Sequence, residues 1–434
     1  MDKMADVLGR AGAWCGQNKY LSAIKNAFQN FMPLTIAGAI GVLWCNVLVN
    51  DQTGLGLFFK PIMALDFLNP AFQAVNFCTI SCITVGITLG IAQEIGVWNM
   101  GAERAGYIPG LVGLAAWLSV TNTSHMVDGA KEAFTGIAGN ELGATGLFTG
   151  MIIGVLSVEL FCFFEKQDAL KIKMPEQVPP GVARAFEVLV PATITLIITA
   201  CIGSACYNLT GLYLNDVIKN GIQGPLGAVG ATILGVMIIY LVIMLFWLVG
   251  IHGNNMLSAV KEALFTPLAL ENVEAFNKGE TPKNIINMYA LQMWGEFGGS
   301  GVTIGLVIAI MIFGKREDNK AIATLSLVPG LFNINETVTF GIPMVLNPIL
   351  GIPFVVAPLV TIIIGYVLTV IGFCPVACLT VPWTTPPIVF GFLACGANVM
   401  GAVTQAILIV VSTVIYVPFL ISYEKYQNKQ AAEA

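Results

Sequence analysis

Long stretches of apolar residues, almost free of charge, constrain the fold of this chain more than any other feature of its sequence. A helix that crosses a bilayer needs about 20 mostly apolar residues. Clean stretches of about that length lie at residues 28–49, 74–97, 105–121, 145–164, 187–209, 226–251, 352–373 and 399–421. Only 10% of the 434 residues are charged, whereas soluble domains carry about 25%. We therefore predict an all-α polytopic membrane protein.

Two further apolar regions, both in the second half, are interrupted by residues that break helices. Glycines interrupt residues 285–313, and prolines interrupt residues 375–395. Broken backbone at membrane depth is tolerated only inside protein or along a water-filled cavity. Paired interruptions of this kind are typical of the binding site of a transporter. We predict two re-entrant hairpins at these places, with kinked helices that bind nothing as the alternative.

Lysine and arginine in short loops indicate the orientation, because they favour the cytoplasmic side. They occur before residue 26 and, after the fourth span, at Lys166, Lys171, Lys173 and Arg184. Residues 1–25 also place apolar residues at helical spacing, which is typical of an amphipathic helix on the membrane surface; a solvent-exposed helix is the alternative. We predict about ten spans plus the two hairpins, both termini in the cytoplasm, and a polar tail over residues 422–434.

The composition argues against several classes of protein. The net charge of −5 is dispersed and forms no basic stripe, so we expect no nucleic-acid partner. Ten cysteines stand beside only two histidines. We interpret the cysteines as small buried residues, with disulfides and metal binding as the alternatives. We expect neither a metal nor a cofactor.

Polar residues at membrane depth are hypotheses for function. His252 lies between two glycines at the end of a span and precedes Asn254 and Asn255. The glycines let the backbone open, so the imidazole and both amides are candidates for a ligand cavity. A histidine at the membrane interface is the alternative.

Glu336 is a carboxylate in an otherwise apolar region, where it needs a partner or a polar ligand. It is a candidate to accept a hydrogen bond from a substrate hydroxyl, or to act as general base when that hydroxyl is phosphorylated. An ion pair with a nearby lysine is the alternative. Together with His252, it suits a neutral polar substrate.

Aromatic and glycine-rich features extend the candidate site. Trp383 lies between prolines, and its ring suits the apolar face of a pyranose, although tryptophan is equally common at membrane interfaces. The glycine cluster around Gly299 and Ser300 predicts a tight turn with backbone amides for hydroxyls or phosphate. Glu94 and Glu159 lie in spans of the first half, and we interpret them as structural pairs, with a proton pathway as the alternative.

A series of short motifs, in this order, carries a family resemblance: Met32-Pro33-Leu34, Met174-Pro175-Glu176, Gly250-Ile251-His252-Gly253, Gly298-Gly299-Ser300-Gly301, Asn335-Glu336, Leu346-Asn347-Pro348 and Pro382-Trp383-Thr384. Over nearly its whole length the chain resembles the membrane IIC component of the lactose/cellobiose/diacetylchitobiose family of the phosphoenolpyruvate-dependent sugar phosphotransferase system. Gln292 stands where some members of the family have aspartate.

The resemblance implies a homodimer in a bacterial cell membrane. Residues 26–210 are the expected scaffold and dimerisation half, and residues 211–421 the expected transport half, which holds one disaccharide of the cellobiose, diacetylchitobiose or lactose type. A separate cytoplasmic IIB protein, itself charged by IIA, is the expected phosphoryl donor. The chain is thus expected to be a transport component that depends on partners for the chemistry.

The resemblance also implies roles for individual residues. His252 and Glu336 are expected near the hydroxyl that becomes phosphorylated. The expected substrate-binding residues are His252, Asn254, Asn255, Gln292, Gly299, Ser300, Asn335, Glu336 and Trp383.

Two other classes of protein fit the same apolar chain. An ion-coupled secondary transporter would release unmodified sugar and use Glu94 or Glu159 as a proton carrier. A membrane-embedded glycosyltransferase or hydrolase would act without a partner protein, but the sequence lacks the carboxylate clusters and metal ligands expected for it.

Overall fold

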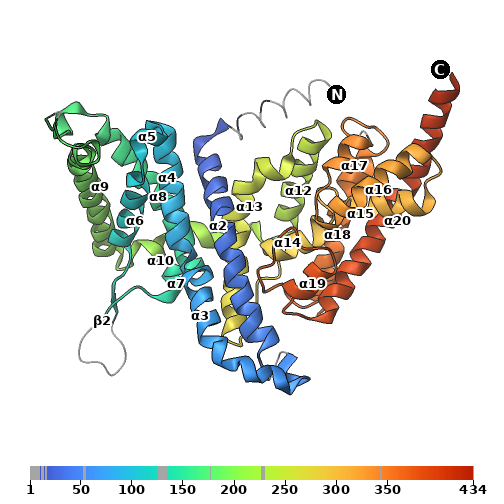
Figure 1. Cartoon of the computed structure of the whole chain (residues 1–434), viewed down its shortest axis with the longest axis horizontal. Helices are drawn as coiled ribbons and strands as arrows, with labels where there is room; N and C mark the ends of the chain where they lie inside the picture. The colour runs from blue at the N-terminus through green and yellow to red at the C-terminus, as the bar shows by residue number, and fades with distance from the viewer. Residues whose placement is uncertain are drawn as a thin grey trace. The chain divides into compact units, whose positions relative to one another are not determined.

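The computed structural model describes residues 10, 14, 17–51, 55–125, 134–175, 177–225, 230–342 and 344–433, apart from the side chains of Leu57 and Asn140. These residues are mostly helical (Figure 1). They form two compact units: the N-terminal unit, Gln17–Gly38 with Gln73–Gly227, and the C-terminal unit, which joins Met1–Gly16 and Ala39–Phe72 to Ala228–Ala434. Each unit is described by itself below.

Four helices form the core of the N-terminal unit: α4 (Ile83–Met100), α6 (Ile108–Val120), α8 (Ala144–Glu165) and α9 (Pro180–Thr210). Small residues let their backbones approach closely, as is common for helices packed in membranes. A side chain at Gly96 of α4 would collide with Pro109 of α6, and one at Gly113 of α6 would collide with Ala92 of α4. The close contact of α4 and α6 therefore depends on these two glycines.

Shorter elements complete this unit. They are η4 (Ile80–Cys82), α5 (Ala102–Ala105), α7 (Gly139–Leu142), η5 (Asp168–Leu170), α10 (Leu214–Ile218), η6 (Lys219–Gln223) and the antiparallel strands β1 (Ser124–His125) and β2 (Phe134–Thr135). Two helices pass from one unit into the other along the chain, α2 (Lys19–Leu43) and α3 (Asn69–Cys78).

Two carboxylates in the spans of the N-terminal unit are bonded to polar side chains of α2. Glu94 accepts a hydrogen bond from the Asn26 amide at 2.9 Å. Glu159 forms an ion pair with Lys19 at 2.6 Å. The interpretation of both carboxylates as structural pairs is confirmed, because each is bonded to a neighbouring helix of its own unit.

The C-terminal unit contains the broken apolar regions. Its helices are α12 (Ile233–Leu248), α13 (Gly253–Asn277), α14 (Met288–Gly295), α15 (Ile304–Phe313), α16 (Glu317–Leu331), α17 (Glu336–Gly341), α18 (Gly351–Val370), α19 (Val389–Ala394) and α20 (Val399–Glu433). The short elements η1 (Trp44–Leu48), η2 (Leu55–Leu57) and η3 (Lys60–Leu68) belong to the same unit.

Both interruptions predicted from the sequence fall between helices of this unit. Residues 296–303 separate α14 from α15, and residues 371–388 separate α18 from α19. A third break, at residues 332–335, separates α16 from α17. The polar candidates of the second half thus lie at helix ends and in turns, where backbone groups are free to face a ligand.

Six helical stretches among the described residues are long and apolar enough to cross a membrane: Lys19–Leu48, Lys60–Met100, Ala144–Glu165, Pro180–Thr210, Gly351–Val370 and Val399–Glu433. Three shorter apolar helices, α6, α12 and α15, lie within other predicted apolar regions. The multi-pass character is therefore confirmed. The total of ten spans and the re-entrant path of the two broken regions stay predictions.

The ends of the chain differ in detail from the expected boundaries. Of the predicted amphipathic helix, residues 1–9, 11–13 and 15–16 lie outside the described residues. The helix α2 begins at Lys19 and continues without a break through the predicted start of the first span. The helix α20 extends to Glu433, so the described part of the predicted polar tail continues the last span as helix.

Candidate functional site

His252 occupies the N-cap position of α13, and its imidazole bonds to the backbone of the first helical turn. Its Nδ1 accepts a hydrogen bond from the Asn255 backbone N–H at 3.2 Å, which caps the helix. An accepting Nδ1 places the proton of the neutral ring on Nε2. The ring also packs on Trp247 of α12, with centroids 4.5 Å apart. The cap and the indole together fix the direction in which Nε2 points.

Glu336, the first residue of α17, lies opposite that nitrogen. The His252 Nε2 and a Glu336 carboxylate oxygen are 3.8 Å apart, which is too long for a direct hydrogen bond. Both side chains are partly exposed, at 37% and 48%. A hydroxyl beside this gap can lie about 2.8 Å from both groups. Among the described residues, Glu336 forms no ion pair with a lysine, so the structure does not support that alternative.

The glycine turn, Gly298 to Gly301, adopts a backbone that other residues rarely take. Gly298, Gly299 and Gly301 have φ angles of 70°, 87° and 80°. A Cβ on Gly299 would lie 2.6 Å from the Cβ of Asn335, so the turn also approaches the start of α17 closely. The Tyr416 hydroxyl of α20 donates to the Gly301 carbonyl at 2.8 Å. The turn is therefore rigid and built into the unit.

Two asparagines before α17 connect the glycine turn to the rest of the site. Asn335, which is buried, donates from its amide to the Ser300 carbonyl at 2.9 Å. Asn333 accepts from the Gly298 N–H at 2.6 Å. These bonds bring the predicted residues Gly299, Ser300 and Asn335 together directly beside Glu336.

Asn333 also reaches the second broken region, which carries Trp383. Its amide donates to the Trp383 carbonyl and, at 3.0 Å, to the Thr385 carbonyl. The φ angle of Asn333 is 63°, a left-handed conformation that asparagine tolerates better than most residues. The Trp383 side chain is 44% exposed, so its ring is available to a ligand. Asn333 was not among the predicted site residues, because a sequence does not reveal a bridge between distant loops.

A buried ionic cluster supports the site from one side. Lys261 of α13 forms an ion pair with Glu296, and the Tyr240 hydroxyl of α12 donates to the same carboxylate at 2.7 Å. Tyr240 and Trp247 are seven residues apart on α12, so they lie on one face of that helix. This cluster could not be predicted from the sequence, since Glu296 and Lys261 lie in separate segments.

The side chains of three further predicted residues have no hydrogen-bond partner among the described residues. The side-chain oxygens of Asn254 and Gln292 are buried and have no hydrogen-bond partner among the described residues. The Asn255 side chain is exposed beside the imidazole cap. Unpaired buried carbonyls of this kind are costly unless a ligand or water donates to them.

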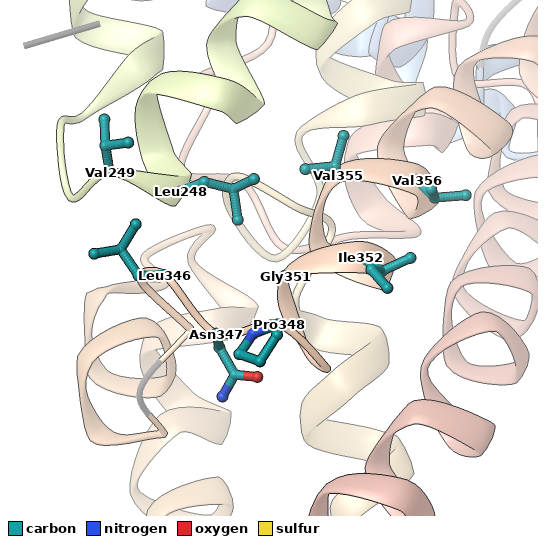
Figure 2. Close-up of a pocket in the computed structure, with 9 residues that line it drawn as sticks. All are labelled: Leu248, Val249, Leu346, Asn347, Pro348, Gly351, Ile352, Val355 and Val356. Carbon is teal, nitrogen blue, oxygen red and sulfur yellow. The ribbon is translucent and has the colours of Figure 1, made fainter. Parts of the chain in front are cut away.

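An apolar pocket lies next to the site but differs from it in chemistry. It has a volume of about 380 Å³ and lies between the end of α12 and the start of α18. Of the nine residues that line it, only Asn347 is polar, and Figure 2 shows its amide directed away from Leu248. The Asn347 oxygen caps the backbone N–H groups of Ile349 and Leu350, each at 2.9 Å. The pocket therefore offers little to a sugar hydroxyl.

The described residues contain no group of three or more histidine, cysteine, aspartate or glutamate side chains arranged to hold a metal ion. The polar groups of the site are instead donors and acceptors suited to a neutral, hydroxyl-rich molecule.

Comparison with known sequences points to one family. Residues 25–358 match the family model described as "Phosphotransferase system, EIIC". The oligo-beta-mannoside-specific EIIC component of Bacillus subtilis is 32% identical over 98% of this chain and 94% of its own length. The cellobiose-specific EIIC component of Lactococcus lactis is 30% identical over 98% of each chain.

Two further similarities bear on partners and on the fold. The lactose-specific EIICB component of Streptococcus mutans is 32% identical over 96% of this chain, which spans 71% of that longer protein. The crystal structure of the transporter ChbC, the IIC component of the N,N'-diacetylchitobiose-specific phosphotransferase system, matches with a TM-score of 0.88 at 30% identity. That match covers 97% of both chains.

Proposed function

Because the chain belongs to the EIIC family of the phosphotransferase system, it is a sugar permease of that system, and we propose that its substrate is a β-linked disaccharide. The proposed permease delivers this sugar to a separate IIB protein for phosphorylation. Its relatives are named for cellobiose, lactose, diacetylchitobiose and oligo-β-mannosides, all of which are β-linked.

The gap between His252 and Glu336 carries the chemical part of the proposal. With a separation of 3.8 Å, the two groups can share one hydroxyl without bonding to each other. The Nε2–H of His252 donates to the hydroxyl oxygen and orients it. The Glu336 carboxylate accepts the hydroxyl proton, and as the phosphoryl group arrives it acts as general base. His252 is then a positioning donor, and Glu336 the base.

The remaining predicted residues fit a pyranose in this position. The Trp383 ring offers an apolar face, and the amides of Asn254, Asn255 and Gln292 offer hydrogen bonds to hydroxyls. The rigid glycine turn, with Ser300, closes the floor of the site. We propose that these residues bind the substrate, together with Gly299 and Asn335.

Direction comes from chemistry on the sugar. Phosphorylation adds about −1.5 to −2 charges near neutral pH. An anionic sugar is repelled by Glu336 and is costly to move back through an apolar path. The permease itself needs only to equilibrate neutral sugar, and the phosphoryl donor lies on IIB. The fusion of C and B parts in the lactose-specific EIICB relative supports this partnership.

We further propose a homodimer with both termini in the cytoplasm. The positive residues after the fourth predicted span support this orientation, because they favour the cytoplasmic face. An even number of spans precedes that loop, which places the N-terminus on the same side.

The decisive experiment is uptake into liposomes that contain only the purified protein, without an ion gradient. Radiolabelled cellobiose, diacetylchitobiose, lactose and mannobiose are compared in turn. We expect saturable equilibration of at least one of them, abolished in His252→Ala. Glu94→Gln is a suitable control, because glutamine can still accept the hydrogen bond from Asn26.

An ion-coupled transporter would give the opposite pattern. Uptake would then require a proton gradient, unmodified sugar would accumulate, and Glu94→Gln would be inactive. Such a result would overturn the proposal.

A further inference from the structure

A row of polar residues follows His252 along α13. Asn255, Ser258, Glu262 and Thr266 are spaced by three or four residues, so they share one face of the helix. Asn255 is exposed, Ser258 and Glu262 are half-buried, and Thr266 is buried. In a chain with so few charges, a carboxylate on this row needs a polar environment. The row therefore forms a polar face of α13 that begins beside His252.

Glu262 is the charged member of this row, and half of its hydrogen-bonding capacity is unused. The Thr266 hydroxyl donates to its Oε2. Its Oε1 has no partner among the described residues, although it is not one of the fully buried unpaired atoms. Since Glu262 as a whole is half-buried, this oxygen keeps the capacity to accept a further hydrogen bond.

The local charges leave Glu262 without a cation of its own. The neighbouring ammonium of Lys261 is already paired with Glu296. Glu262 lies near enough to both groups to interact with them electrostatically, and when all three are ionised they carry one negative charge in excess. A partly buried carboxylate in this situation is stabilised by neutral hydrogen-bond donors.

A second polar face comes from α14. Tyr289 and Gln292 are three residues apart and so lie on one face of this helix, and Glu296 follows directly after its end. The ion pair of Glu296 with Lys261 joins the end of α14 to α13, and Tyr289 lies near enough to Glu262 to interact with it electrostatically. The side-chain oxygen of Gln292 is buried and unpaired among the described residues. The Tyr289 hydroxyl also bonds the Thr380 hydroxyl at 2.6 Å, which joins the second broken region to α14.

The spacing along α13 suits a substrate with more than one ring. Ten residues separate His252 from Glu262, a rise of about 15 Å. Helical side chains point back toward the N-terminus, so the carboxylate itself lies nearer to His252 than this rise. When the hydroxyl to be phosphorylated lies between His252 and Glu336, the polar face of α13 is within reach of a β-linked second ring.

We propose that Glu262 binds the second sugar ring, by accepting two hydrogen bonds from adjacent hydroxyls. This inference rests on the proposed function and specifies its substrate class. A pyranose with free vicinal hydroxyls provides two O–H donors to one carboxylate. A 2-acetamido ring provides a single N–H there and places a carbonyl oxygen near the negative charge. The site is therefore selective for β-linked glucosides or mannosides over N-acetylated sugars.

Binding of sugars to the purified full-length protein, measured by isothermal titration calorimetry, tests the inference. Cellobiose, mannobiose and N,N'-diacetylchitobiose are compared in wild type, Glu262→Gln, Glu262→Asp and Glu274→Gln. We expect wild type to bind cellobiose or mannobiose about tenfold or more tightly than diacetylchitobiose, since hydrogen bonds to charged groups are strong. Glu262→Gln should reduce this ratio to near one by weakening the unmodified sugars, and Glu262→Asp should fall between.

The control is Glu274→Gln on the same helix, where the native carboxylate pairs with Lys278. It should keep the wild-type ratio. Equal ratios in wild type and Glu262→Gln would overturn the inference while leaving the proposed function intact, and so would a wild-type preference for diacetylchitobiose. Absence of binding for these three sugars and for lactose would overturn both.

Discussion

At the scale of single residues, the site depends on the short, fixed separation between the side chains of His252 and Glu336. His252 is held by the Asn255 N–H and by Trp247, and the resulting separation from Glu336 is 3.8 Å. The sequence predicted the identity of both residues, because a histidine between glycines and a carboxylate in an apolar region are conspicuous. It did not predict which nitrogen carries the proton, since the cap that fixes the tautomer appears only in three dimensions.

Glu336→Gln separates binding from chemistry. The amide can still accept a hydrogen bond from the sugar hydroxyl, but it cannot take its proton. We expect sugar affinity to fall by less than about tenfold, which corresponds to about 1.4 kcal/mol, and phosphorylation by IIB to fall about 10²- to 10⁴-fold. Calorimetric binding and single-turnover transfer from phosphorylated IIB measure the two effects. Equal losses in both would argue against a base role.

Lys261→Met tests the buried ionic cluster. Removing the cation leaves the Glu296 charge nearly buried and uncompensated, and we expect a loss of about 3–5 kcal/mol in the free energy of unfolding. The double variant Lys261→Met/Glu296→Gln removes both charges and should lose less than the single variant. Thermal unfolding in detergent compares them. A double variant as unstable as the sum of both single variants would show that the residues act independently.

At the scale of elements, the site is made where broken helices meet. The interruptions at 296–303 and 371–388 were predicted from glycine and proline, and the structure confirms that no helix continues through them. The third break, before α17, contains Asn333 and Asn335 in an otherwise apolar stretch. The connections between the breaks were not predictable, because single hydrogen bonds between residues far apart in sequence leave no periodic pattern.

Asn333 connects the glycine turn to the broken region that carries Trp383, and variants of this residue test the connection. Asn333→Asp keeps the acceptor for the Gly298 N–H but loses the amide donors to Trp383 and Thr385. Asn333→Gly keeps the left-handed backbone and loses every side-chain bond. Each lost bond costs about 0.5–1.5 kcal/mol, so we expect both variants to unfold at lower temperature and to bind sugar more weakly.

Tryptophan fluorescence provides both readouts for Asn333. Asn208→Ala is a control in the N-terminal unit, where an exposed amide makes one long side-chain bond. Wild-type affinity in Asn333→Asp would show that the Trp383 loop keeps its position without this bridge.

At the scale of the whole molecule, the protein supplies the path and the orientation of the sugar, and its partner supplies the energy. We expect vesicles that contain the permease alone to equilibrate sugar without accumulation. With phosphorylated IIB on the cytoplasmic side, sugar should accumulate only as its phosphate. Thin-layer chromatography of the vesicle contents distinguishes the two species. Accumulation of free sugar without IIB would contradict this division of work.

The apolar pocket beside the site is bordered by a backbone hydrogen bond between two of its lining residues, Leu346 and Leu248. The Leu346 N–H donates to the Leu248 carbonyl at 2.8 Å, which joins the segment after α17 to the last turn of α12. The segments that carry Glu336 and His252 are therefore joined by a main-chain hydrogen bond. Side chains that contact the outer ring of a substrate can be exchanged during evolution without altering this bond. In this chain, the two groups proposed to act on the hydroxyl can thus keep their spacing while the residues around the outer ring change.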